Sequence, residues 1–372
     1  MNQEKRKNIL QHFPQQDQIE GTSTEPVIIS PEDSLLAMIE ISQAAIERRK
    51  TGEHLAHLGG MIKEVDYNQL IAESSIPNDG RGFERISRLF NELAEGHANS
   101  ASEFYLTNAI PIPTKIALAA NVFGASLNSN AVAEIYGQAA YMAEIQCIAM
   151  MARAVGFKRT TAGGYFTSGG TAGNKAALRV GLQKTGILKR DIPIKELDLE
   201  TDTLNFRKIG VPHNRYVLSS ELGHFSIDEV VASNGLPTNN NIAVKTNSDN
   251  SMDISDLEEK MRFIFREGGE IAAVYATVGT TDGFGMDEVS KVREVRDRLA
   301  KEFNKPYQPH SHADLANGGF FTMFNNYDFD KNPLEINSVA LKSIQKITKR
   351  MLQVKEADSA IFDFHKLGYT PY

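Results

Sequence analysis

The spacing of hydrophobic residues changes along this chain near Gly156. Beyond it, short runs rich in β-branched and aromatic residues alternate with longer segments whose apolar residues recur at helical spacing. Such alternation is typical of βα repeats, in which strands form a mainly parallel sheet that helices flank, so it predicts an α/β fold. The strand-like runs lie at 215–219, 241–245, 271–278, 309–313 and 359–364.

The N-terminal part of the chain lacks this alternation. Residues 1–29 are polar and rich in Gln, which predicts a loosely ordered arm. Ser30 and Pro31 then have the form of an N-cap and a first-turn proline, and apolar residues keep helical spacing up to Gly52. We therefore expect a helix in this region.

These patterns divide the chain into two parts. We expect a polar arm and N-terminal helical segment over residues 1–79, and a larger domain over residues 80–372. The start of that domain, 80–156, is expected to be mostly helical, with breaks at 110–113 and 128–130. The stretch 321–357 is expected to be an insertion between two strands.

Composition narrows the function classes. With 372 residues, 41% of them hydrophobic, the chain can bury a substantial core. The net charge of -7 argues against a nucleic-acid partner. Cys147 is the only cysteine, which fits a reducing cytoplasm. We see neither a signal peptide nor an apolar segment long enough to cross a membrane.

A glycine-rich turn precedes a predicted helix. Gly169, Gly170 and Thr171 lead into the apolar-faced stretch 172–182. A helix N-terminus with glycines lets backbone amides approach an anion, and a threonine adds a hydroxyl. A tight strand-to-helix turn without a ligand explains the pattern about equally well. A phosphate-binding Walker A loop is excluded, because Asn174 interrupts its pattern.

Asp314 ends another predicted strand and is followed by small residues. A carboxylate there could hold a pyridine ring protonated, which makes the ring an electron sink. A residue that caps the next turn is the plainer alternative. His310 and His312 also alternate with Asp314, but a metal site of this kind needs further ligands on later strands.

The run 359–364 brings His365 and Lys366 to its carboxyl end. A lysine in such a place is a candidate Schiff-base nucleophile, because burial lowers the pKa of an amine and frees it for attack on an aldehyde. A surface lysine is the alternative for the residue taken alone. His224 follows the strand-like run 215–219, where its ring could stack on a planar cofactor or pack as a structural residue.

Taken together, five motifs resemble one family in order and spacing. They are Thr167–Asn174, His224–Ser226, Ala276–Gly285, His312–Gly319 and Asp363–Tyr372. The chain looks like a group II pyridoxal-phosphate (PLP)-dependent amino-acid decarboxylase over residues 80–372. The resemblance implies the large domain of the PLP-dependent transferase fold type I, a cytoplasmic homodimer and an L-amino acid as substrate.

The resemblance also assigns roles around the cofactor ring. Lys366 would hold the cofactor covalently, Asp314 would pair with the pyridine nitrogen, and His224 would stack on the ring. Ala316 would pack on the opposite face, and Thr277 would lie near the polar edge.

The same resemblance places the phosphate and the substrate. Gly170 and Thr171 would bind the phosphate, with His365 beside it. The stretch 97–113 would help to shape the substrate pocket. No metal is implied.

The expected reaction is decarboxylation of an L-amino acid to an amine. The long separation between Asp314 and Lys366 resembles bacterial tyrosine decarboxylases and favours tyrosine or another aromatic amino acid. A carbon–carbon lyase similar to sphingosine-phosphate lyase is an alternative. Family members continue past the lysine into a C-terminal small domain that we expect to be missing, so an inactive truncated fragment is a third reading.

Overall fold

The computed structural model describes residues 66–74, 88–89, 111–130, 134–186 and 214–372. The chain comprises two units, Met1–Leu106 and Thr107–Tyr372, and the sheet lies in the second. In the first unit, helix α3, Tyr67–Glu73, is N-capped by Asp66. The predicted arm, the helix after Ser30 and the predicted boundary after residue 79 fall outside the described residues.

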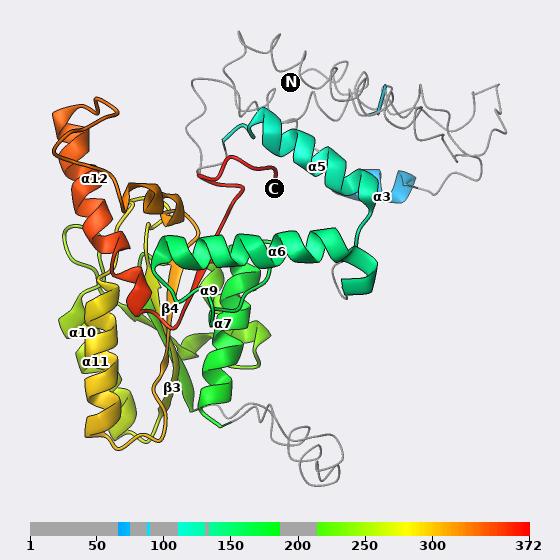
Figure 1. Ribbon diagram of the computed structural model, residues 1–372. Coiled ribbons are helices and arrows are strands. Elements are labelled where there is room, and N and C mark those ends of the chain that lie inside the picture. Colours follow the sequence, from blue (N-terminus) through cyan, green and yellow to red (C-terminus); the bar gives the residue numbers. More distant parts are fainter. Residues whose placement is uncertain (1–65, 75–87, 90–110, 131–133, 187–213) are drawn as a thin grey trace, which may run out of the picture. The chain divides into compact units, whose positions relative to one another are not determined.

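Five parallel strands form one sheet in the order β2-β1-β3-β4-β5 (Figure 1). This confirms the predicted α/β class and parallel sheet. The strands are β1 Arg215–Ser220, β2 Asn241–Val244, β3 Glu270–Thr277, β4 His310–Leu315 and β5 Ser359–Phe362. The strand order reverses between β1 and β3: β2 is added on one side of β1, and β3, β4 and β5 follow on the other. The loops at the carboxyl ends of β1 and β3 therefore lead away in opposite directions, and open α/β sheets bind ligands at such a point.

Helices cover both faces of the sheet (Figure 1). On one face, α7 and α9 pack together, and α7 contacts β3 and β4; on the other, α10 and α11 contact β3. The helices of this unit are α5 Lys115–Leu127, α6 Glu134–Val155, α7 Gly170–Lys184, α9 Ser226–Ser233, α10 Ile254–Arg266, α11 Val289–Glu302 and α12 Ser338–Met351. The 3₁₀ helices are η3 Thr238–Asn240, η4 Gly319–Phe324 and η5 Val354–Glu356.

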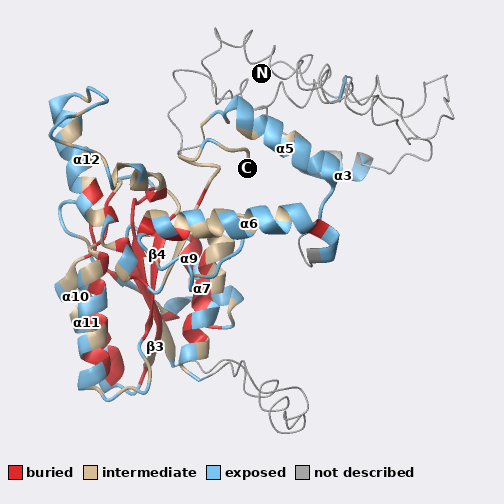
Figure 2. Cartoon of the chain, in the orientation of Figure 1, coloured by how far each residue is buried: buried red, intermediate tan, exposed pale blue. Residues whose placement is uncertain are grey.

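The core has two halves because side chains alternate across the sheet. Val217 and Tyr275 pack toward α7 and α9, whereas Leu218 and Val274 pack toward α10 and α11. Figure 2 shows β3 and β4 buried and the outer faces of α10 and α11 exposed. Both sheet faces are therefore covered, as the continuous apolar strands predict.

Several strand ends differ from the prediction by one or two residues. β4 begins at His310 rather than Pro309, which has no N–H to donate to a neighbouring strand. β5 ends at Phe362, because the chain turns at Asp363, whose carbonyl accepts from the Lys366 amide at 3.2 Å. The predicted insertion 321–357 does lie between β4 and β5 and contains α12 and η5, whereas η4 begins two residues before it, at Gly319.

The described part of the N-terminal helical region agrees with the prediction. Helices α5 and α6 flank a break at Asn128, which caps α5 in the left-handed conformation with φ of 45°. Asparagine tolerates that conformation better than most residues. The stretch 90–110, which includes most of the predicted substrate-contacting segment, lies outside the described residues.

Candidate functional site

One cavity lies at the carboxyl ends of the strands, beside the start of α7. It brings together seven of the eight cofactor-binding residues that the sequence predicts, and Thr277 is the exception. The cavity is lined by Gly170, Thr171, Asn174, His224, Ser226, Thr281, Asp314, Ala316, Asn317, Asp363, His365, Lys366 and Tyr372. The roles of these residues remain predictions.

The N-terminus of α7 forms one wall of the cavity. Gly169 caps the helix with φ of 138°, a conformation that strongly favours glycine. A Cβ on Gly170 would lie 3.1 Å from Asp363 Oδ2, so the glycine lets the helix start pack against the segment after β5. The Ala172 and Gly173 amides donate to the Gly169 carbonyl, whereas the amides of Gly170 and Thr171 precede the first helical hydrogen bond and can bind an anion.

Asp314 is 6% exposed at the end of β4. Its Oδ2 accepts from Asn174 Nδ2 at 2.9 Å, and its Oδ1 accepts from the Ala316 amide at 3.0 Å. The carboxylate is therefore held between α7 and the turn after β4, with one side facing the cavity. Two neutral N–H donors support its charge without neutralising it.

Lys366 lies on the turn after β5 with a carboxylate beside its amine. Its Nζ is 3.2 Å from Asp363 Oδ2, and His365 Nε2 is 3.7 Å from the same oxygen. Burial lowers the pKa of His365, Asp363 partly offsets this, and the nearby Lys366 lowers it further. Asp363 is 5% exposed, and its Oδ1 has no hydrogen-bond partner among the described residues.

His224 lies on the loop between β1 and α9 with its ring orientation fixed. Its Nδ1 accepts from the Ser226 amide at 3.2 Å and lies 2.8 Å from Ser226 Oγ. The ring stacks on Phe225 with centroids 4.3 Å apart. A neutral ring bonded in this way carries its proton on Nε2.

Thr277 ends β3, directly beside Asp314 in the parallel register. It is 6% exposed, and its amide donates to Asp287 Oδ2 at 2.7 Å. Backbone contact between the two exit turns is closest at Gly318, where a Cβ would lie 2.1 Å from the Val278 carbonyl oxygen. Glycine at position 318 therefore allows the turns that follow β3 and β4 to lie in contact.

The side chains of the alternating His310, His312 and Asp314 do not converge on a metal position. Both histidines contact Ser359 Oγ, whereas Asp314 and His312 contact Asn174. Within the described residues, no group of three or more His, Cys, Asp or Glu residues could hold a metal ion. The helices that the structure describes include none long and apolar enough to cross a membrane.

Sequence reasoning assigned no role to six cavity residues with polar side chains. Asn174 and Asp363 are the most telling, because both are at least nine-tenths buried and polar. Asn174 follows Thr171 and Gly170 by three and four positions, so helical spacing alone places it on the same face of the helix as these two predicted residues. The other four are Ser226, Thr281, Asn317 and Tyr372.

No protein-family model matches the sequence. Curated relatives carry decarboxylase names. The chain is 28% identical over 229 residues to an L-2,4-diaminobutyrate decarboxylase of Acinetobacter baumannii, covering 60% of this chain and 38% of that protein. It is 28% identical over 184 residues to an L-tyrosine decarboxylase of Enterococcus faecium, covering 45% of this chain and 28% of that protein. The chain thus matches well under half the length of each.

Known structures share the fold. An Oryza sativa TDC in complex with PLP and tryptamine superposes with a TM-score of 0.68 at 18% identity. The match covers 94% of this chain and 63% of that one. At this identity the likeness shows that this chain shares the fold of that protein.

Proposed function

We propose that this chain is the cofactor-binding part of a group II PLP-dependent amino-acid decarboxylase, a carboxy-lyase. One observation carries the proposal. A lysine amine, a buried carboxylate and a glycine-opened helix N-terminus line a single cavity, at Lys366, Asp314 and Gly170. Each element answers one chemical feature of PLP, which has an aldehyde, a pyridine nitrogen and a phosphate. The decarboxylase relatives support the same conclusion.

The residues present fit this cofactor. Asp314 is a buried carboxylate that accepts two N–H bonds and turns toward the cavity, as a partner for a protonated nitrogen requires. The start of α7 presents unpaired amides where an added Cβ at Gly170 would crowd Asp363. The Lys366 amine lies 3.2 Å from Asp363 Oδ2, and Oδ1 of the same carboxylate, which has no hydrogen-bond partner among the described residues, is another group that a ligand could satisfy.

Four residues of the cavity then have distinct roles toward the cofactor ring. PLP, when bound, supplies an electron sink for the electron pair that loss of carbon dioxide leaves on the substrate. Lys366 holds the cofactor through its amine, and Asp314 holds a proton at the ring nitrogen. The fixed ring of His224 supports one face of the cofactor, and Ala316 supports the other.

The phosphate belongs at the start of α7. The amides of Gly170 and Thr171 and the Thr171 hydroxyl donate hydrogen bonds, and the partial positive charge of the helix N-terminus favours the anion. His365 stands next to this region. Thr277 holds the end of β3 in position beside Asp314, because its backbone amide donates a hydrogen bond to Asp287.

We propose an L-amino acid as substrate, with tyrosine or another aromatic amino acid as the first choice. The relatives named for tyrosine and for 2,4-diaminobutyrate make these two amino acids the pair to compare. Their decarboxylase names support release of an amine rather than the aldehyde expected of a carbon–carbon lyase. A product assay separates the two reactions.

We further propose that two copies of this chain associate, in the cytoplasm. Helices α5 and α6 support this, because their large apolar side chains are exposed (Figure 2). Ile116 is 77% exposed, Phe123 66% and Tyr136 71%. Large exposed apolar patches mark association surfaces. A second copy would cover this one.

The first test is the visible spectrum of the purified full chain with added PLP, before and after borohydride. We expect a yellow band that borohydride traps permanently and that Lys366→Ala abolishes. Lys342→Ala, an exposed lysine on α12, is the matched control and should keep the band. A folded wild-type chain without a band, or a band equally strong in Lys366→Ala, would refute the proposed function.

A further inference from the structure

A line of buried polar side chains runs along the sheet away from Asp314. Asn174 Nδ2 lies 2.9 Å from Asp314 Oδ2, and His312 Nε2 lies 3.0 Å from Asn174 Oδ1. Ser359 Oγ then lies 2.7 Å from His312 Nδ1 and 2.7 Å from His310 Nε2. Four hydrogen bonds thus connect the cavity to the interior of the sheet.

The chemistry of each group fixes the direction of these bonds, beginning at the carboxylate. An ionised Asp314 can only accept, so the Asn174 amide nitrogen faces it and the amide oxygen faces His312. That oxygen can only accept, so the Nε2 of His312 carries a proton.

The remaining two bonds follow in the same way. A neutral imidazole with its proton on Nε2 accepts at Nδ1, so the Ser359 hydroxyl donates to His312. The Ser359 oxygen in turn accepts from His310 Nε2–H. Every donor in the line therefore points toward Asp314, and a proton on Nδ1 of His312 instead would break the bond to Asn174, because Nε2 and the amide oxygen would both be acceptors.

Burial favours the neutral form of both histidines. His312 is 1% exposed and His310 3%. Burial lowers the pKa of each well below its ordinary range, and in His312 the attraction of Asp314 only partly offsets this. The ring of His312 also packs edge-on against Tyr275, with centroids 5.2 Å apart. Tyr275 Oη donates to the Asn174 carbonyl at 2.7 Å, which ties α7 to β3 at this point.

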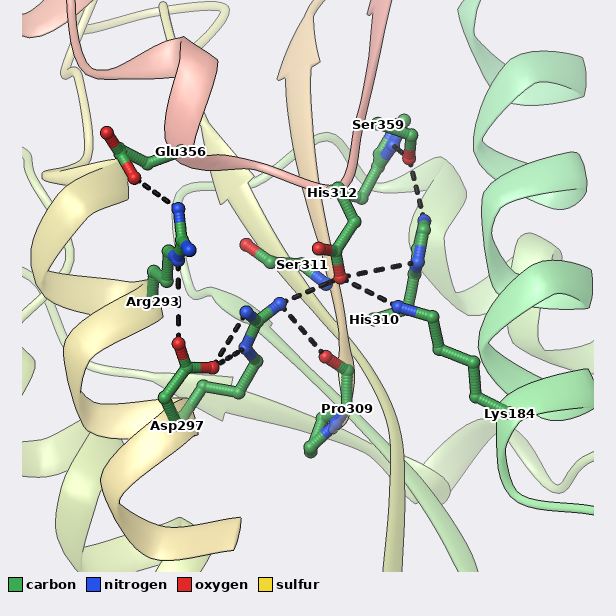
Figure 3. Close-up of polar contacts among 11 residues, drawn as sticks. Lys184, Arg293, Asp297, Pro309, His310, Ser311, His312, Glu356 and Ser359 are labelled. Carbon is green, nitrogen blue, oxygen red and sulfur yellow. Dashed lines mark hydrogen bonds and ion pairs between the residues drawn. The ribbon is translucent and has the colours of Figure 1, made fainter. Parts of the chain in front are cut away.

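An ion cluster anchors the far end of the line (Figure 3). Asp358 Oδ2 accepts from Arg296 Nη1 at 2.7 Å, from Lys184 Nζ at 2.8 Å and from the Ser311 amide at 3.0 Å. Arg296 is itself 2% exposed. Because Asp358 directly precedes Ser359, this cluster fixes the position of the serine. The line is therefore held at both ends.

We propose that His312 is a positioning residue: as its neutral Nε2–H tautomer it fixes the orientation of the Asn174 amide, and through that amide it keeps the Asp314 carboxylate aimed into the site. The inference rests on the proposed function, since Asp314 meets a cofactor only there. Without the Nε2–H donor, the buried amide oxygen of Asn174 loses its partner, and only the bond to Asp314 holds the amide in place. His312 never touches the cofactor in this scheme.

The tautomer is measurable without any cofactor. Two-bond ¹H–¹⁵N correlation spectra of the full chain with ¹⁵N-labelled histidine distinguish Nδ1–H, Nε2–H and imidazolium forms. We expect His312 to remain the neutral Nε2–H tautomer from about pH 6 to about pH 8, where an ordinary histidine titrates. An Nδ1–H tautomer, or an imidazolium within this range, would overturn the proposal.

PLP titration of variants tests the consequence for the site. His312→Phe keeps a flat ring without a donor, whereas His312→Gln places an amide N–H near the position of Nε2. We expect PLP affinity to fall about tenfold in His312→Phe, as for loss of one buried hydrogen bond, and to recover largely in His312→Gln. Equal affinity in His312→Phe and wild type would contradict the proposal, as would equal losses in both variants.

A second substitution leaves the His312 ring unchanged. Ser359→Ala removes the donor to His312 Nδ1; we expect His312 to keep the Nε2–H tautomer that the Asn174 oxygen requires, and PLP to bind more weakly because Nδ1 loses its partner. Ser343→Ala, on the exposed side of α12, is the matched control. An unchanged PLP affinity in Ser359→Ala, or an Nδ1–H tautomer of His312 in that variant, would count against the line of bonds. Failure of the wild-type chain to bind PLP would refute the proposed function instead, and the tautomer in the free chain would still decide the role of His312.

Discussion

At the scale of single residues, the described part of the chain contains a buried carboxyl group outside the cavity that couples stability to pH. Asp287 is fully buried, with Oδ1 accepting from the Met252 amide at 2.6 Å and Oδ2 from the Thr277 amide at 2.7 Å. Burial raises its pKa to about 7, because the loss of water outweighs the two amide donors. An acid with a raised pKa in the folded state binds more protons folded than unfolded.

This shift sets the sign of the pH dependence. The contribution of Asp287 to the free energy of unfolding is fully present below its unfolded pKa of about 4 and is lost as the pH rises to about 7. Asp287→Asn removes this dependence, so the stability advantage of wild type over the variant should shrink between about pH 5 and about pH 8. Urea unfolding of both proteins at about pH 5 and about pH 8 measures the difference in their free energies of unfolding. Asp282→Asn, an exposed position in the same loop, is the control and should show no such trend; an advantage that grows with pH would contradict the prediction.

Residues also show where sequence reasoning reaches its limit. Asp314 and Lys366 were predictable because each follows a strand-like run, and strand ends of a parallel sheet meet at one edge. Asn174 lies in the motif Thr167–Asn174, but the sequence predicts no role for it. Its importance arises from contacts with Asp314 and His312, which lie 140 and 138 positions away in sequence. Such contacts exist only once α7 packs against β4.

At the scale of elements, glycines decide how closely helices approach the sheet. A Cβ at Gly181 of α7 would lie 2.4 Å from the Ala272 carbonyl oxygen on β3, whereas a Cβ at Gly124 of α5 would meet nothing within 4 Å. Both glycines lie within helices, where alanine is ordinarily favoured by about 0.5–1 kcal/mol. Alanine at Gly124 therefore tests helix propensity alone, whereas alanine at Gly181 tests helix propensity together with packing against the sheet.

We expect opposite effects from the same substitution at these two sites. Gly181→Ala should lower the free energy of unfolding by about 1–3 kcal/mol, because the helix must move away from the sheet. Gly124→Ala should leave it unchanged or raise it by up to about 1 kcal/mol. Thermal unfolding followed by circular dichroism measures both. Equal effects at the two sites would mean that α7 does not pack on β3 at this distance.

The elements themselves were largely predictable, and their ends were not. All five strand-like runs form strands, because short β-branched and aromatic runs between amphipathic segments fit buried parallel strands. The ends depend on particular backbone bonds. β4 extends to Leu315, two residues past the predicted end, because it pairs with Phe362 of β5. That pairing depends on strand register, which hydrophobicity alone does not encode.

At the scale of the whole molecule, the central question is what covers the apolar side chains of α5 and α6. The described residues of α5 are almost entirely exposed, and none of them is buried. By contrast, α7 and α10 bury one face against the sheet. An amphipathic helix ordinarily buries its apolar side chains, and association with a second copy would achieve this.

We therefore expect the purified chain of 41.1 kDa to elute with about twice that mass in size-exclusion chromatography with light scattering. Ile116→Glu places a charge on the exposed apolar side of α5 and should shift the protein toward the monomer, because a buried unpaired carboxylate is costly. Val339→Glu is the matched control, since Val339 is 73% exposed on α12, close to the 77% of Ile116. A monomeric wild type, or an equal shift in both variants, would exclude α5 as the interface. A dimer that persists in Ile116→Glu would place the contact elsewhere on the chain.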